Sequence, residues 1–154
     1  MNRPHNIKRS LRAIGLGFVC AWSLALAAAE PSPALPPIVQ SGLTLLASGG
    51  PQPAVDTWFQ GGILERNERA KSAAEQRLKR LAGILGNYRS YELIETREIG
   101  RTSQFLYLTL NFERGALYAR FLVCRADQQW VVQILDFDTQ PEAIMPWLAT
   151  AQAK

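Results

Sequence analysis

Residues 104–125 read QFLYLTLNFERGALYARFLVCR, and this stretch decides the fold. On each side of Glu113-Arg114-Gly115, apolar side chains occupy every second position, which is the period of a half-buried β-strand. The short polar segment between the two runs predicts a hairpin, so the strands are expected to pair antiparallel. The residues expected to share the buried face are Leu106, Leu108, Leu110 and Phe112 in the first strand and Leu117, Ala119, Phe121 and Val123 in the second.

Two further strands flank this hairpin. Residues 88–99 form a run polar enough for an edge strand, and residues 130–138 form an apolar run after the turn at 127–129. Consecutive strands joined by short loops are usually antiparallel neighbours. The sequence therefore predicts a four-stranded antiparallel meander.

Helical periodicity precedes the strands. Short helices are expected over residues 38–47 and 53–61, and a long one over residues 64–85, where Glu65–Arg69 and Glu75–Lys79 have the i, i+4 spacing of surface pairs. The long helix has an apolar stripe that is expected to pack on one face of the sheet. Helices followed by strands predict an α+β fold, with N-terminal helices on a curved four-stranded sheet. The stripe consists of Ala70, Ala74, Leu78, Leu81 and Leu85.

The N-terminus has the layout of a secretory signal, with basic residues, then an apolar run over 13–29 that ends in Ala27 and Ala29. We expect a signal peptide over residues 1–29, a proline-rich linker over 30–37, a single domain over 38–146 and a tail over 147–154. The expected location is the periplasm or the exterior. The alternative is that residues 13–29 remain as an inner-membrane anchor.

The composition excludes several functions. Residues 1–29 hold four of the 17 basic residues, no acidic residue, the sole histidine His5, and Cys20, one of the two cysteines. The remaining chain is close to neutral, so no basic surface for nucleic acid is expected. Without histidine it has no Ser-His-Asp relay and no imidazole ligand for a metal. We therefore expect no metal and no cofactor.

Several short motifs carry a family resemblance. Gly86-Asn87-Tyr88 opens the polar strand, Phe112-Glu113-Arg114-Gly115-Ala116-Leu117 spans the hairpin, and Phe137-Asp138-Thr139 precedes Pro141-Glu142-Ala143-Ile144-Met145-Pro146. Over residues 55–146 the chain resembles small exported bacterial proteins of the nuclear transport factor 2-like, cystatin-like superfamily. The resemblance implies a sheet wrapped around a helix into a cone, an open end that holds a ligand in some members, and frequent dimerisation through the outer sheet face. The catalytic aspartate and histidine of its enzymes have no counterpart here, since no Asp occurs between Asp56 and Asp127.

Three sets of side chains are candidates for a site. Asp136 and Asp138 share a strand face, so they are either a catalytic carboxylate pair or structural groups, with Asp136 paired to an arginine such as Arg120. Tyr107, Tyr118 and Arg120 form either a polar ligand-facing set or a subunit interface. Cys124 is expected to be an inert, buried small hydrophobic residue, with an intermolecular disulfide or a redox-sensing role as the alternative.

The leading functional hypothesis is an exported module that binds a small apolar ligand or a protein partner without catalysis, as a homodimer. The enzymatic alternative is a carboxylate-based isomerase, dehydratase or hydrolase, which requires one of the two aspartates to face the interior. A third hypothesis is a membrane-anchored accessory protein.

Overall fold

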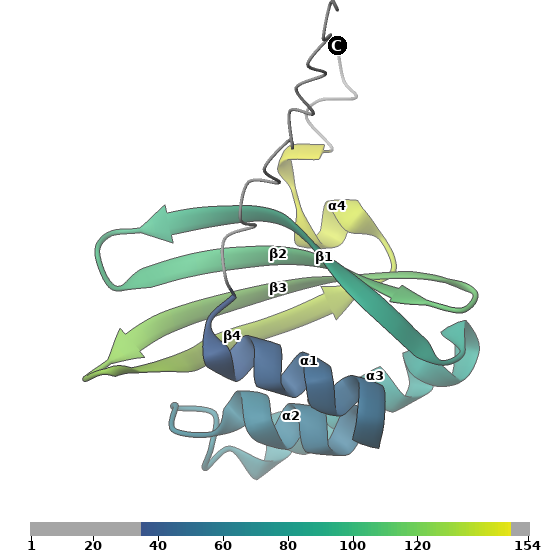
Figure 1. Ribbon diagram of the computed structural model, residues 1–154, viewed down its shortest axis with the longest axis horizontal. Coiled ribbons are helices and arrows are strands. Elements are labelled where there is room, and N and C mark those ends of the chain that lie inside the picture. Colours follow the sequence, from purple (N-terminus) through teal and green to yellow (C-terminus); the bar gives the residue numbers. More distant parts are fainter. Residues whose placement is uncertain (1–34, 149–154) are drawn as a thin grey trace, which may run out of the picture. The chain divides into compact units, whose positions relative to one another are not determined.

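The computed structural model describes residues 35–148, which fold as helices packed against a curved four-stranded antiparallel sheet, an α+β arrangement (Figure 1). The expected fold class is confirmed. The helices are α1 (Pro37–Gly49), α2 (Pro51–Phe59), α3 (Glu68–Leu85) and the short α4 (Pro141–Ile144). The strands are β1 (Tyr88–Ile99), β2 (Ser103–Phe112), β3 (Gly115–Ala126) and β4 (Gln129–Asp138), and they lie in the order of the sequence.

The sheet separates the molecule into two layers. Helices α1, α2 and α3 lie on one side, here called the inner face, and α4 lies on the other side, the outer face (Figure 1). The alternation predicted for residues 104–125 is confirmed, because all eight side chains expected on the buried face are buried. Phe121 is fully buried and meets the Trp58 ring edge-on, with centroids 5.2 Å apart.

The short helices, rather than the long one, cover the centre of the sheet. Helices α1 and α2 each supply four buried residues, whereas α3 supplies only Leu78. The stripe of α3 packs against the same core, as expected, but apart from Leu78 its residues are only partly buried. The physical reason is charge: α1 has no charged residue in its 13, whereas α3 has seven in 18 and keeps most of its surface in water.

The start of the long helix also differs from the expectation. Helix α3 begins at Glu68 because the side chain of Asn67 accepts a hydrogen bond from the backbone N–H of Ala70 at 3.0 Å, which caps the helix. Glu65 precedes that cap, so the predicted Glu65–Arg69 helical pair does not exist, whereas the Glu75–Lys79 pair does.

The predicted limits of the domain are too narrow at both ends. Leu35 is buried in the main core and α1 starts at Pro37, so the linker expected over residues 30–37 ends before Leu35. Proline fits the first turn of a helix because its missing N–H has no partner there. At the other end, Trp147 and Leu148 pack against the outer face instead of starting a free tail. The predicted signal peptide lies outside the described residues.

Candidate functional site

One wall of an open groove is formed by α3. Ala70, Ala73, Ala74 and Arg77 follow one another at helical spacing, so they share one face of the helix. Three of these four side chains are methyl groups, which leave room between the helix and the neighbouring strand. The loop before α3 lies close to β4 at Gly62, where a Cβ would lie 2.8 Å from the carbonyl oxygen of Val132.

The facing wall is formed by β4, an edge strand of the sheet. Its pairing with β3 is irregular between Val123↔Val132 and Leu122↔Ile134, which leaves Gln133 as an additional residue, a β-bulge. Gln133, Ile134, Leu135 and Phe137 all contribute to the groove. The register puts Leu135 and Phe137 on the inner face and Ile134 on the outer face, so the groove reaches the unpaired edge of β4.

The groove, here called the α3–β4 groove, has a volume of about 320 Å³. That is at the lower end of the range for small-molecule sites. Arg77 is its only charged lining residue and Gln133 its only other polar one. The remaining lining is apolar and consists of Phe59, Leu64, Ala70, Ala73, Ala74, Ile134, Leu135 and Phe137.

Arg77 connects the two walls. Its Nη2 donates a hydrogen bond to Oδ2 of Asp138 at 2.7 Å, and its guanidinium carbon lies 5.2 Å from the centre of the Phe137 ring. Phe137 points to the inner face and Asp138 to the outer face. The Arg77 side chain therefore passes the end of β4 and places a positive charge beside the apolar lining.

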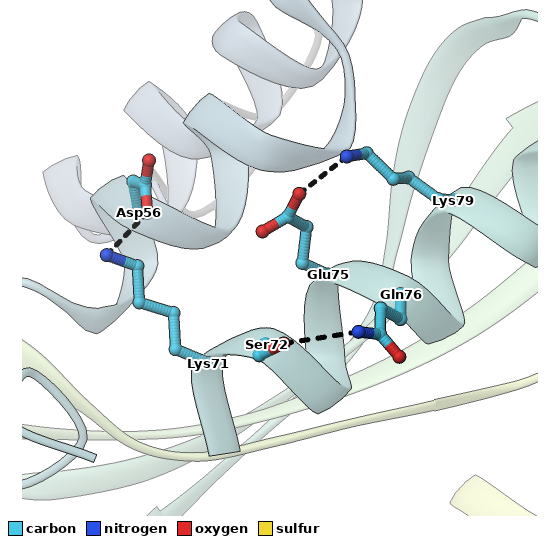
Figure 2. Close-up of polar contacts among 6 residues, drawn as sticks. All are labelled: Asp56, Lys71, Ser72, Glu75, Gln76 and Lys79. Atoms are coloured by element: carbon cyan, nitrogen blue, oxygen red, sulfur yellow. Dashed lines mark hydrogen bonds and ion pairs between the residues drawn. The ribbon is translucent and has the colours of Figure 1, made fainter. Parts of the chain in front are cut away.

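The opposite side of α3 is polar and is fixed to α2. Figure 2 shows Lys71 of α3 in an ion pair with Asp56 of α2 at 2.7 Å, next to the Lys79–Glu75 pair at 2.6 Å. Gln76 lies in the adjacent i, i+4 row of the helix and donates to Ser72 at 3.3 Å. The Asp56 carboxylate raises the pKa of Lys71, so this link is intact at neutral pH.

Groups with shifted pKa values lie away from the groove. Burial raises the pKa of Tyr88 to about 12, and hydrogen bonds from Asn87 lower the pKa of Glu113. Neither residue contributes to the groove lining.

Asp136 and Asp138 both lie on the outer face, opposite Arg120 and Tyr118 of β3. Asp136 accepts a hydrogen bond from Arg120 at 2.5 Å, the cross-strand pair that the sequence suggested, and Asp138 accepts from Arg77 and from the backbone N–H of Gln140. Neither carboxylate faces the interior, so the condition for the carboxylate-based enzyme is not met.

Tyr107, Tyr118 and Arg120 also lie on the outer face, and none of them lines the groove. Tyr107 is buried by residues 141–148, here called the C-terminal latch, through Ile144 and Met145 and through the Trp147 ring at 4.7 Å. Tyr118 packs against the same cluster. Part of the surface expected to hold a ligand or a second subunit is therefore covered by the chain itself.

Cys124 is half-buried on the outer face, and its sulfur accepts a hydrogen bond from the Gln133 side chain at 3.1 Å. Within residues 35–148, no group of three or more His, Cys, Asp or Glu side chains is arranged to hold a metal ion. In the same range, no helix is long and apolar enough to cross a membrane.

A second groove of about 380 Å³ lies where the start of α1 meets the β3–β4 turn. Its lining mixes the amide side chains of Gln60, Gln128 and Gln129 with Ile38, Trp130 and Val131, and contains no charged residue. The α3–β4 groove is the stronger candidate because its apolar walls converge on a single charged group.

The sequence reasoning missed the groove. Ala70 and Ala74 were assigned to the core stripe, and Arg77, Ala73 and Gln133 were not singled out. One usable signal was the spacing of three alanines and an arginine on one helix face, and another was the uncharged run over residues 129–135 of the last strand. Comparison with models of known protein families, with curated proteins and with solved structures found no match to this chain.

Proposed function

We propose that this protein is a non-catalytic binding module and that its α3–β4 groove holds a small apolar molecule. The observation that carries the proposal is the groove itself, about 320 Å³ of space between alanine side chains and the apolar side chains of β4. Burying the apolar surface of a ligand there would be favourable by roughly 25 cal/mol per Å². The resemblance to the nuclear transport factor 2-like superfamily is part of the proposal, since it implies a cone whose open end holds a ligand in some members.

The test is binding of N-phenyl-1-naphthylamine, a neutral probe whose fluorescence rises in apolar surroundings. For a small ligand in an open site, we expect a Kd on the order of 10–100 µM. Ala73→Trp fills the groove and should weaken binding by at least about tenfold. The matched control, Gln76→Trp, places the same ring on the polar side of α3 and should leave the Kd unchanged. Absence of binding, or equal loss in both variants, would refute the proposal.

We also propose that the chain is exported, on the basis of the signal-like residues 1–29. The intact mass of the protein isolated from its native source tests this. A mature form that begins near Glu30 is expected, and retention of residues 13–29 would instead favour the membrane-anchored alternative. The predicted homodimer remains a prediction, which sedimentation of the purified protein would test.

A further inference from the structure

We propose that the α3–β4 groove prefers carboxylates, namely small aryl or alkyl monocarboxylic acids with the apolar part between α3 and β4 and the carboxylate on Arg77. This inference rests on the proposed function of the groove and adds the class of its ligand. The observation behind it is the charge of the lining, which contains one guanidinium and no acidic side chain. An anionic head on an apolar body is complementary to that lining.

Arg77 is already held in place for this role. Oδ2 of Asp138 accepts a hydrogen bond from Nη2 of Arg77, and Oδ1 of Asp138 accepts one from the backbone N–H of Gln140 at 3.0 Å. The turn after β4 thus holds the Asp138 carboxylate in place, and the carboxylate in turn holds the Arg77 guanidinium. A guanidinium has five N–H donors, and Asp138 engages one of them. Arg77 therefore retains donors for a second carboxylate while its position is set.

The number of charges favours a monoanion. A phosphate monoester carries nearly two negative charges and is usually held by several donors or cations, whereas the groove offers one guanidinium. A carboxylate matches the planar fork of arginine and can accept two parallel hydrogen bonds from it. Gln133, the other polar lining residue, donates its amide to the Cys124 sulfur on the outer face, so Arg77 is the group expected to hold the head group.

The experiment compares 2-naphthoate with 2-naphthamide, two probes of nearly equal shape that differ in charge. Calorimetric titration of the full chain at neutral pH gives a Kd for each. Because Arg77 is partly exposed and already paired, we expect the carboxylate to bind about fivefold more tightly than the amide. Higher salt should weaken binding of the carboxylate and leave that of the amide unchanged.

Substitutions distinguish between two roles of Arg77, recognition of the negative charge of the ligand and maintenance of the shape of the groove. Arg77→Gln should make the two affinities equal by weakening only the carboxylate. Arg80→Gln, which removes an exposed arginine three residues further along α3, should keep the wild-type ratio. Arg77→Lys keeps the charge without the planar fork, so its ratio should be smaller than in the wild type but still favour the carboxylate.

The outcomes distinguish the two proposals. If the amide binds in the groove but the carboxylate binds no better, the ligand class is refuted and the proposed function stands. If Arg77→Gln weakens both probes equally, Arg77 only shapes the groove and the ligand class is again refuted. The ligand class is also refuted if a folded Arg77→Lys variant binds the carboxylate no more tightly than the amide. If neither probe binds the wild type, both proposals fail.

Discussion

Arg77 on α3 donates a 2.7 Å hydrogen bond to Asp138 at the end of β4, although the two residues are 61 positions apart in the sequence. This ion pair joins the helical layer to the last strand of the sheet. It also occupies Oδ2 of Asp138 and holds a positive charge next to an apolar groove. Much of what the structure implies about function follows from this contact.

The Arg77–Asp138 pair should contribute little to stability, because both side chains are partly exposed. We expect a coupling free energy of about 0–1 kcal/mol from a double-mutant cycle with Arg77→Gln and Asp138→Asn, measured by urea unfolding. A coupling free energy of several kcal/mol would contradict this and would show that the main role of Arg77 is to stabilise the fold.

Gly42 should be far less tolerant than Gly83, although both lie inside helices. A Cβ at Gly42 would lie 2.0 Å from Nε1 of the buried Trp58, which donates to the backbone carbonyl of Val39 at 3.2 Å. Gly42→Ala should therefore cost about 2–3 kcal/mol. At Gly83 a Cβ would meet nothing within 4 Å, so Gly83→Ala should stabilise by about 0.5–1 kcal/mol. Thermal unfolding of both variants tests this contrast, and a similar loss in both would contradict it.

Glu113 should make stability depend on pH in acid. Hydrogen bonds from the backbone and side chain of Asn87, with the Arg89 charge, hold the pKa of this carboxyl below its usual 4.5. A group whose pKa is lower in the folded state stabilises the fold above its unfolded pKa, and this stabilisation disappears as the pH falls through the folded pKa. The advantage of the wild type over Glu113→Gln should thus be constant near neutral pH and shrink below about 4.5.

Urea unfolding of both proteins at several pH values between neutral and about 3 measures the difference. A difference in unfolding free energy that does not change with pH would show that the hydrogen bonds to Glu113 do not favour its charged form.

Trp147 should anchor the C-terminal latch. Its ring meets Tyr107 edge-on at 4.7 Å, and the guanidinium carbon of Arg97 lies 3.6 Å from its centre. Trp147→Ala should cost about 1–3 kcal/mol, since it removes an aromatic pair, a cation–π contact and buried area. The neighbouring Pro146→Ala, at an exposed position, is the control and should change stability little. Equal effects of the two substitutions in urea unfolding would contradict the anchoring role.

The sheet was predictable because its signal is local. Each strand can be recognised without knowledge of distant contacts, from the alternation over residues 104–125, the polar run over 88–99 and the turn residues between the runs. The structure confirms all four strands. The long helix was also predictable from its period. How completely other elements cover its apolar face was not predictable, because periodicity shows that a helix has an apolar face but not which other element covers that face.

The groove was not predictable for a similar reason. The relation between Ala73 and Ile134, or between Arg77 and Asp138, depends on where α3 lies against β4, which no local sequence pattern encodes. The burial of Tyr107 depends on the chain folding back after Gln140. Alternation correctly put Tyr107 on the outer face, but it carried no information about the latch.

The central claim is that the α3–β4 groove binds small apolar molecules, and a backbone amide NMR titration with 2-naphthamide tests it most directly. The account predicts saturable shift changes at residues 70–77 of α3 and 133–137 of β4. Changes concentrated at the second groove, around Gly61 and residues 128–131, would contradict it, as would an unchanged spectrum at the solubility limit of the probe.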